Sequence, residues 1–312
     1  MKALVYNKKG SPDKLVYQDV EKPKPGDNEV LVKVESVSVN AADYRPMKMG
    51  MIPKKKIFGA DIAGKVELVG KNIHQFKVGD EVIGDLSDHG YGGFAEYAVA
   101  PEKTLVLKPA SITFEEAAAL PLAAVTALQA LRNKGNIQKG QKVLIVGSAG
   151  GVGTFAVQLA RYYGTIVTAV CGTKNVDQTS SLGADYVIDY TKENFTKNDE
   201  RFDLILAVNG NYPLFAYKRA LNPNGIYVMV GGGLIQIFKS IFFGWLMSFG
   251  SKKMRNLSAK SNQKDLEFIA NLVENGKIKP VIEKQYSLEK AADAMHYVGK
   301  GHAQGKVVIN VE

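Results

Sequence analysis

The residues with the clearest chemical meaning lie in the stretch VLIVGSAGGVG, at 143–153. Four apolar residues run into a turn with four glycines in seven positions, and helix-forming sequence (TFAVQLARYYG) follows it. A strand, a glycine-rich turn and a helix in this order can bind a pyrophosphate, because the N–H groups of the helix N-terminus point toward negative charge. We expect a dinucleotide site here, formed by Ser148, Ala149, Gly150, Gly151 and Val152.

The glycines of this turn have separate expected roles. Gly150 would let the backbone approach the pyrophosphate without a side chain in between, and Gly153 would let the helix pack tightly on the strand. Ser148 takes the first glycine place of the G-x-G-x-x-G pattern, and Gly147 lies just before it. The alternative is a structural turn without a ligand, but the flanking strand and helix favour the dinucleotide site.

The end of the next strand-like run, VTAVCGTKN, indicates which dinucleotide is bound. An NAD site usually has an Asp or Glu about 20 residues after the glycine turn, where it binds the ribose hydroxyls. This sequence has Thr173 and Lys174 instead, and both would attract a 2′-phosphate. We therefore expect NADPH as the cofactor, with Lys174 as an ordinary surface lysine in the alternative interpretation.

Two regions of the chain, with different patterns of predicted strands and helices, would position these residues. From Lys142 onward strand-like and helix-like segments alternate, which predicts βαβ units and a parallel sheet. A helix-forming stretch at 112–135 contains Pro121, where we expect a break or kink. After residue 260 a helix, a strand, a second helix and a second strand are similar in character to the first third. That first third is rich in strand-like runs separated by Gly, Pro and Asp, at 29–39, 64–70, 80–84 and 94–100.

This organisation predicts a discontinuous β-rich domain with a nucleotide-binding domain inserted in it. We place the β-rich domain at residues 1–122 and 259–312, and the inserted domain at residues 123–258. A chain of 312 residues is long enough to form two such domains.

The charge and the cysteine content indicate which classes of binding partner and which cellular compartment suit this chain. The net charge of +9 suits an anionic partner, namely nucleic acid, an acidic membrane face or a phosphorylated cofactor, although scattered lysines also keep a protein in solution. The only dense basic run, Lys54-Lys55-Lys56, is too short for a nucleic-acid footprint, so we expect no nucleic-acid partner. The single cysteine, Cys171, fits a reducing compartment, and the start of the sequence has no apolar stretch typical of a signal peptide. We expect a cytoplasmic location.

One apolar segment, LIQIFKSIFFGWLMSFG at 234–250, has several interpretations. It is short and interrupted for a membrane span, so we expect no stable membrane insertion. It could form a substrate wall, a dimer surface, a shallow membrane contact or a buried helix.

Five stretches, taken in order, resemble the medium-chain dehydrogenase/reductase superfamily: GDEVIG, GGFAEYAVAP, FEEAAALPLAAVTALQAL, GSAGGVG and SLGADYVIDY. Within that superfamily the sequence is most similar to the zinc-free quinone oxidoreductase branch, which includes alkenal and enone reductases. The resemblance covers essentially the whole chain. It implies an α/β fold in which a GroES-like β-rich catalytic domain holds an inserted Rossmann domain with a doubly wound parallel sheet. It also implies a cleft between the domains, a small-molecule substrate and a homodimer.

The resemblance also allows the zinc ligands to be compared residue by residue. Zinc-dependent members carry V-C-x-T-D, where this chain has Val39-Asn40-Ala41-Ala42-Asp43, and G-H-E-x-x-G, where it has the stretch 59–64, GADIAG. Cysteine is replaced by Asn40 and histidine by Ala60, and the four-cysteine lobe is absent. A catalytic zinc needs three protein donors, so we expect no metal site. The histidines lack ligand spacing, and a convergence of Asp43, Asp61, Asp85 and His89 is the alternative.

Loss of zinc removes the Lewis acid that alcohol oxidation needs. Hydride transfer from NADPH to a quinone, or to the β-carbon of an α,β-unsaturated carbonyl, remains feasible because these acceptors delocalise the arriving charge. The resemblance implies that Asn40 lies near the nicotinamide and the substrate carbonyl. It makes Tyr44 a polar contact or proton donor, although an aromatic wall and protonation by solvent are the alternatives, and Arg45 stands where many relatives have tyrosine.

Further cofactor contacts follow from the resemblance, whereas Lys306 is assigned a structural role. These contacts are Thr126, Tyr190, Asn209, Gly231, Gly232 and Gly233, in addition to Asn40. The rival functional hypothesis is a basic NADPH-binding redox sensor whose partner is nucleic acid or a membrane surface.

Overall fold

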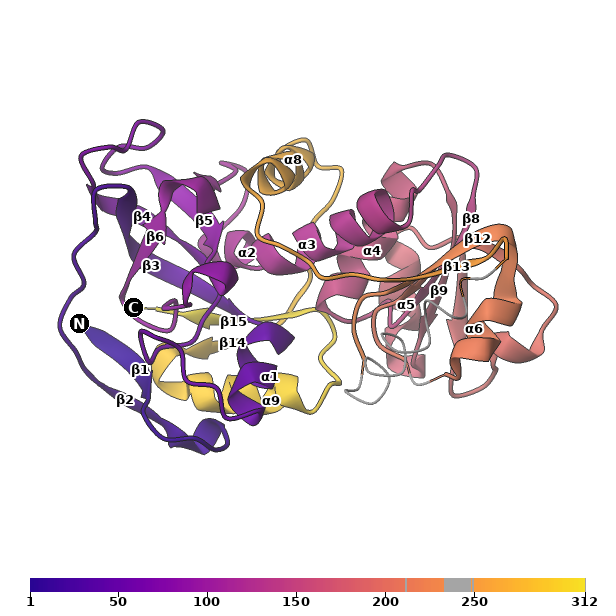
Figure 1. Cartoon of the computed structure of the whole chain (residues 1–312), viewed down its shortest axis with the longest axis horizontal. Coiled ribbons are helices and arrows are strands. Elements are labelled where there is room, and N and C mark those ends of the chain that lie inside the picture. The colour runs from indigo at the N-terminus through magenta and orange to yellow at the C-terminus, as the bar shows by residue number, and fades with distance from the viewer. Residues whose placement is uncertain (211, 233–247, 249, 312) are drawn as a thin grey trace. The chain divides into compact units, whose positions relative to one another are not determined.

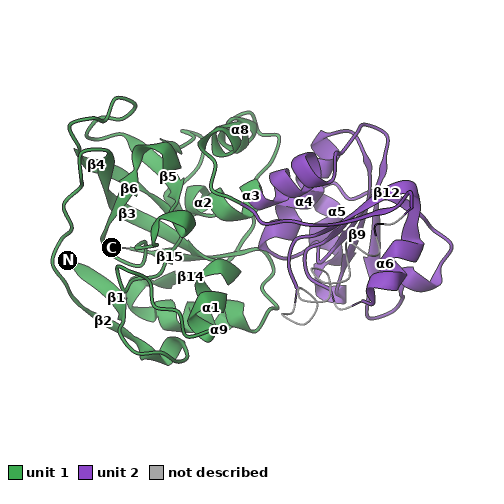
Figure 2. Ribbon diagram, in the orientation of Figure 1, with its two compact units in different colours: residues 1–125, 260–312 green, residues 126–259 purple. Residues whose placement is uncertain are grey.

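The computed structural model describes residues 1–210, 212–232, 248 and 250–311. The chain forms two compact units, unit 1 with residues 1–125 and 260–312, and unit 2 with residues 126–259 (Figure 2). The boundaries predicted from the sequence lie between residues 122 and 123 and between residues 258 and 259. Gly233 and nearly all of the apolar segment 234–250 lie outside the described residues. Among the residues that the structure describes, no helix is long and apolar enough to cross a membrane.

Unit 1 is built on a seven-stranded, mostly antiparallel sheet (Figure 1). Its strands follow the order β14-β15-β3-β4-β5-β7, and β6 pairs with β3 off this path. The strands from the end of the sequence therefore join the sheet formed by the first third, as the discontinuous arrangement requires. A separate two-stranded sheet pairs β1 (Lys2–Tyr6) with β2 (Leu15–Asp19). The strands of the larger sheet are β3 (Glu29–Val39), β4 (Asp61–Val69), β5 (Glu81–Asp85), β6 (Tyr97–Pro101), β7 (Leu105–Leu107), β14 (Ile282–Ser287) and β15 (Lys306–Asn310).

Alternating residues of these strands form the core of unit 1. In β3 the side chains of Val30, Val32, Val34 and Val37 are buried with Ile62 of the neighbouring strand β4. The helices of unit 1 are α1 (Ala41–Lys48), α2 (Phe114–Ala118), α8 (Gln263–Glu274) and α9 (Ala291–Gly299).

The predicted break at Pro121 is confirmed. Helix α2 ends at Ala118 and the next helix, α3 (Pro121–Leu128), begins at the proline. Proline suits the first position of a helix, because the N–H that it lacks would have no intrahelical acceptor there. A π-helical segment, η4 (Gln129–Lys134), follows directly.

Unit 2 is a six-stranded parallel sheet with the order β10-β9-β8-β11-β12-β13. Numbered from β8 as the first strand, this is the 3-2-1-4-5-6 order of the Rossmann fold, so the predicted doubly wound sheet is confirmed. Its helices include α4 (Gly151–Tyr162), α5 (Val176–Ser181) and α6 (Leu214–Ala220). The strands are β8 (Lys142–Val146), β9 (Ile166–Cys171), β10 (Tyr186–Asp189), β11 (Phe202–Ala207), β12 (Leu221–Met229) and β13 (Lys253–Asn256).

Candidate active site

The glycine turn connects β8 to α4 at the point where the strand order reverses, which is where ligands bind in folds of this type. Gly147 has φ +84°, and a Cβ added there would lie 2.6 Å from the backbone oxygen of Asn209. A Cβ on Gly153 would lie 2.2 Å from the backbone oxygen of Gly147. The turn therefore packs against its own helix and against the segment after β11 so closely that neither glycine leaves room for a side chain.

Helix α4 begins at Gly151 with Gly150 as its N-cap. The N–H groups of Gly151, Val152 and Gly153 belong to the first turn and have no acceptor four residues earlier within the helix, so they can bind an anion. Ser148 has no exposed surface, and its hydroxyl donates to the backbone oxygen of Val170 at 3.1 Å. The Ser148 N–H donates to the same Val170 oxygen at 3.1 Å, so both its side chain and its backbone join the turn to β9.

The residues expected around a 2′-phosphate gather after β9 and β10. Thr173 and Lys174 are exposed, and Tyr190 is exposed to 55%. A Cβ on Gly172 would lie 3.1 Å from the Tyr190 hydroxyl, so the tyrosine lies over the backbone that leads to Thr173. The Thr173 hydroxyl itself donates to Asp189 at 2.7 Å.

The remaining expected cofactor contacts lie at strand ends and on α3. Asn209 is exposed beyond β11, and Gly231 is partly buried beyond β12, where its N–H donates to the backbone oxygen of Ala207. Gly232 is buried with φ +129°, and Gly233 lies outside the described residues. Thr126 is buried on α3.

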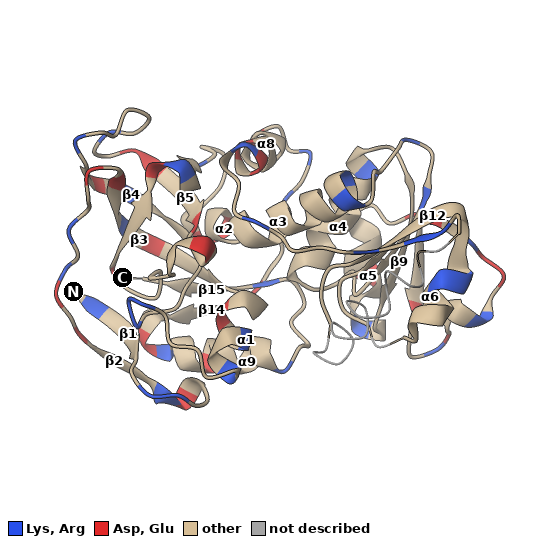
Figure 3. Cartoon of the chain, viewed as in Figure 1, with Lys and Arg blue, Asp and Glu red and all other residues tan. Residues whose placement is uncertain are grey.

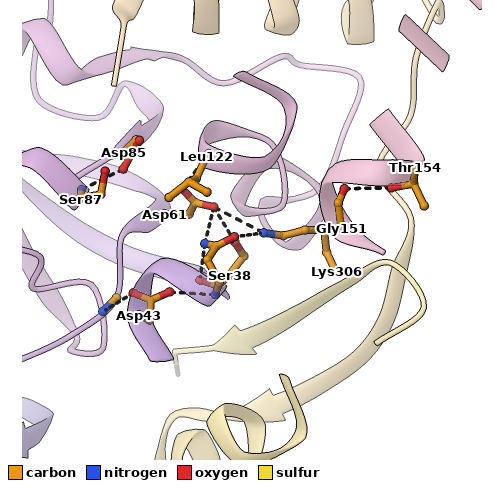
Figure 4. Close-up of polar contacts among 11 residues, drawn as sticks. Ser38, Asp43, Asp61, Asp85, Ser87, Leu122, Gly151, Thr154 and Lys306 are labelled. Atoms are coloured by element: carbon orange, nitrogen blue, oxygen red, sulfur yellow. Dashed lines mark hydrogen bonds and ion pairs between the residues drawn. The ribbon is translucent and has the colours of Figure 1, made fainter. Parts of the chain in front are cut away.

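Unit 1 contains a second group of polar residues, which includes Ser38, Asp61 and Lys306 (Figure 4). Hydrogen bonds connect this group through Asn40. The Lys306 ammonium donates to Asn40 Oδ1 at 2.5 Å, and Asn40 Nδ2 donates to Asp61 Oδ2 at 2.9 Å. The Ser38 hydroxyl donates to the same Asp61 oxygen at 2.7 Å, and the Leu122 N–H donates to Asp61 Oδ1 at 2.9 Å. We call Ser38, Asn40, Asp61 and Lys306 the amide network.

Strand register explains why these residues meet. Ser38 of β3 pairs with Asp61 of β4, which pairs with Asp85 of β5. On the other side of β3, Val39 pairs with Val307 of β15, so Lys306 lies opposite Asn40. Directly opposed residues of antiparallel strands share one face of the sheet, which places the polar groups in two adjoining rows.

Asp43 holds the backbone around Asn40. Its Oδ2 accepts the Asn40 N–H at 2.8 Å, and its Oδ1 accepts the Gly59 N–H at 3.1 Å. The Asp43 carboxylate therefore connects the start of α1 to the backbone at Gly59, while the Asn40 side chain contacts Lys306 and Asp61.

The site concentrates carboxyl groups where water does not reach. Burial raises the pKa of Asp43 to about 7, and the nearby charge of Asp61 adds to this. Burial also raises the pKa of Asp85 to about 7, again with help from Asp61. Burial raises the pKa of Asp61 and lowers the pKa of Lys306, and the charge of each residue opposes the shift of the other. One buried ammonium thus lies among three buried carboxyl groups.

The other predicted catalytic residue, Tyr44, lies on α1 against α9. A Cβ on Gly299 would lie 2.5 Å from Tyr44 Cε2, so the ring packs on bare backbone. Tyr44 belongs to the partly buried residues that line the core of unit 1.

The chemistry of the site does not suit zinc. Where zinc-dependent members have a thiolate, the Asn40 amide is engaged by Lys306 and Asp61. An ammonium 2.5 Å from the amide oxygen would repel a metal cation at that oxygen. In the part of the chain that the structure describes, no three His, Cys, Asp or Glu residues are placed to hold a metal ion.

Comparison with known proteins identifies the family. The alcohol dehydrogenase GroES-like domain model matches residues 26–110, and the zinc-binding dehydrogenase model matches residues 182–309. A chloroplast envelope quinone oxidoreductase homolog of Arabidopsis thaliana is 38% identical over 325 aligned residues, which cover 99% of this chain and 98% of the relative. The chain belongs to the medium-chain dehydrogenase/reductase superfamily. It is an oxidoreductase, as the sequence predicted, and the family supports a nicotinamide cofactor.

Two further relatives of this oxidoreductase bear on the fold and the cofactor. The NADPH-dependent alkenal/one oxidoreductase of Arabidopsis thaliana chloroplasts is 32% identical, with 99% of this chain and 79% of the relative covered. The solved quinone oxidoreductase of Coxiella burnetii superposes with a TM-score of 0.90 at 29% identity, and covers 100% of this chain and 99% of that structure.

Lys306 and Ser38 are the parts of the amide network that sequence reasoning did not place in the site. The signal for Lys306 is a lysine at the head of a strand whose next three residues, Val307, Val308 and Ile309, are apolar and buried. A lysine that is only 2% exposed needs a polar partner, and the amide network supplies it.

Proposed function

We propose that this oxidoreductase transfers hydride from NADPH to quinones or α,β-unsaturated carbonyls without a catalytic metal. The observation that carries the proposal is Asn40, an amide engaged by Lys306 and Asp61 at a position where zinc-dependent members have a ligand. An N–H donor aimed at developing negative charge stabilises an oxyanion, and it does so without a metal ion.

The preference for NADPH rests on the residues after β9. Lys174 is an exposed cation, and Tyr190 extends over Gly172, so both could bind a 2′-phosphate. Asp189, the carboxylate at this end of the sheet, is occupied by Thr173 and Thr191 and is only 7% exposed. The NADPH-dependent alkenal/one oxidoreductase relative supports the same choice.

In the proposed reaction the nicotinamide of NADPH supplies the hydride, and this chain's residues provide alignment and charge stabilisation. Hydride adds to the β-carbon of an enone, the C=C bond becomes an enolate, and one proton completes the saturated carbonyl. For a quinone, one hydride and one proton give the hydroquinone. Solvent and Tyr44 are the candidate proton sources, and the packing of Tyr44 on Gly299 favours solvent.

The rival hypothesis of a basic redox sensor has less support. Figure 3 shows Lys and Arg positions spread over many elements, with Asp and Glu positions among them, over the residues that the structure describes. Interspersed charges are typical of a solvated surface, and a nucleic-acid footprint would need clustered cations.

We also infer a homodimer and a cytoplasmic location, the latter because the buried Cys171 suits a reducing compartment. Light scattering at several protein concentrations tests the first inference. Localisation of the tagged full chain tests the second.

The experiment that tests the proposed function is NADPH oxidation against a benzoquinone, an alkenal and a cyclic enone, with NADP plus an alcohol as the counter-reaction. We expect turnover with the first three, little turnover with the alcohol, and no loss of rate after dialysis against a zinc chelator. NADPH binding without turnover of any acceptor would favour the sensor. Stoichiometric zinc with alcohol oxidation would overturn the metal-free mechanism.

A further inference from the structure

We propose that Lys306 is the positioning residue of the site, which orients the Asn40 amide and strengthens, as a hydrogen-bond donor, the N–H of that amide that does not face Asp61. The turnover assays that test this proposal rest on the function proposed above. The measurement of the amide orientation does not depend on that function, because it needs no substrate.

The geometry places opposite charges at the two ends of one amide. Lys306 Nζ lies 2.5 Å from Asn40 Oδ1, and Asp61 Oδ2 lies 2.9 Å from Asn40 Nδ2. If the amide were reversed, its NH₂ group would meet the ammonium and its oxygen would meet the carboxylate. Both contacts would be repulsive, so the charge pair selects a single orientation of the amide.

The second N–H of Asn40 has only weak acceptors. Nδ2 lies 3.4 Å from both the backbone oxygen and the hydroxyl of Ser38, at the long limit for a hydrogen bond. A stronger acceptor, such as an enolate or hydroquinone oxygen, would compete well for this N–H. A cation on the amide oxygen draws electron density away from nitrogen and makes the N–H a better donor, because linked hydrogen bonds polarise one another.

Stability alone does not account for a lysine at this position. A buried ion pair costs desolvation of both charges, so apolar residues of similar volume often stabilise a protein as much or more. Lys306 is 2% exposed, and the three residues that follow it in β15 are apolar and buried. An apolar side chain at 306 would lie on the same face of the sheet as the buried Val308.

Lys108 shows what a purely structural buried lysine of unit 1 looks like. Its side chain is 5% exposed, and its ammonium donates to the backbone oxygens of Pro109 and Ile112 and pairs with Glu81 at 3.2 Å. It ties together a turn and a neighbouring strand. Lys108 is therefore the matched control for Lys306.

The experiment compares Lys306→Met, Lys306→Gln, Asn40→Ala, the double variant Lys306→Met/Asn40→Ala and the control Lys108→Met. Lys306→Met removes both the donor and the charge, whereas Lys306→Gln keeps a donor for Asn40 Oδ1 without the charge. We expect Lys306→Met to lower kcat about 30-fold and Lys306→Gln about fivefold, with the Kd of NADPH changed less than about threefold. Lys108→Met should leave kcat within about twofold of the original.

The double variant tests whether Lys306 acts through Asn40. If it does, adding Lys306→Met to Asn40→Ala changes kcat by less than about threefold, because the group that Lys306 orients is already gone. If the two losses multiply, or if neither Lys306 variant lowers kcat, the proposal is overturned.

An NMR measurement separates this proposal from the proposed function. The side-chain amide signals of Asn40, assigned by their loss in Asn40→Ala, should exchange with solvent at least about tenfold faster in Lys306→Gln and Lys306→Met than in the parent. Unchanged exchange and unchanged shifts would overturn the orienting role, even if the enzyme reduces quinones. Changed exchange in a protein that reduces no acceptor would keep the orienting role and reject the reductase. Since Lys306→Gln keeps a polar partner for the amide, it carries the test if Lys306→Met does not fold.

Discussion

The Thr173 hydroxyl donates a 2.7 Å hydrogen bond to the carboxylate of Asp189, at the adjoining ends of β9 and β10. The Thr191 hydroxyl donates to the other oxygen of the same carboxylate at 2.8 Å. Burial of Asp189 opposes its ionisation, but these two hydroxyl donors hold its pKa below the ordinary value. Asp189 is therefore an anion at neutral pH, and it uses the Thr173 proton that a cofactor phosphate would need.

Lys174 should therefore carry most of the discrimination between NADPH and NADH. Lys174→Glu replaces an exposed cation with a charge that repels a 2′-phosphate. We expect the KM for NADPH to rise about tenfold or more, with the KM for NADH nearly unchanged. Lys192→Glu is the control, because Lys192 pairs with Asp189 at 3.7 Å on the same side of the sheet. Equal losses in both variants would indicate general repulsion and remove the specific role of Lys174.

Gly153→Ala should disrupt the glycine turn. The new Cβ would lie 2.2 Å from the backbone oxygen of Gly147, so helix and strand would have to separate. We expect the free energy of unfolding to fall by about 2 kcal/mol or more, which denaturant titration would measure. We also expect weaker NADPH binding, which cofactor fluorescence would measure. In Gly140→Ala the new Cβ meets no atom within 4 Å, although φ is +82°, so it should cost only ~1 kcal/mol and leave NADPH binding intact.

Asp85→Asn should change how stability depends on pH. Burial raises the pKa of Asp85 from 3.8 to about 7, so its protonated form is favoured in the folded state. Its stabilising contribution is complete below pH 3.8 and is lost as the pH rises through about 7. The free energy of unfolding of Asp85→Asn, relative to that of the parent, should therefore increase by ~2 kcal/mol from pH 5 to pH 8. Denaturant unfolding at both pH values measures this difference. The exposed Asp27, which pairs with Lys71, provides the control Asp27→Asn, and an equal gain there would contradict the assignment.

Tyr44→Phe tests whether the Tyr44 hydroxyl has a chemical role. Because the ring packs against Gly299, Phe should preserve the contact, and kcat should stay within about twofold of the parent. Tyr44→Ala, which removes the ring, should lower the free energy of unfolding by ~2 kcal/mol. A loss of more than about tenfold in kcat for Tyr44→Phe, with normal stability, would instead make the hydroxyl the proton donor.

Much of the fold was predictable because its signals are local. The apolar strand, the glycine turn and the helix of 143–164 lie within one continuous stretch, and Pro121 marks a helix start by its own covalent geometry. Asn40 and Ala60 could be compared with zinc ligands because they occur within short motifs. The two-stranded sheet β1–β2 was not predicted. The strand β13 was not predicted either, because it is a four-residue edge strand with the largely polar sequence KMRN.

The amide network was not predictable in the same way. Lys306 and Asn40 are 266 residues apart, and only the register of β15 on β3 brings them together. A shift of one residue in that register would turn Lys306 to the opposite face of the sheet. The Thr173–Asp189 contact depends likewise on β9 and β10 ending at the same level.

Because β15 follows unit 2 in the chain, a ribosome finishes the whole Rossmann sheet before it adds the lysine that contacts Asn40. Under the function proposed above, a nascent chain would thus hold the unit expected to bind the dinucleotide while unit 1 still lacks the strand that carries Lys306. Premature termination between α9 and β15 would leave the proposed dinucleotide site of unit 2 in the product and remove Lys306 from the amide network.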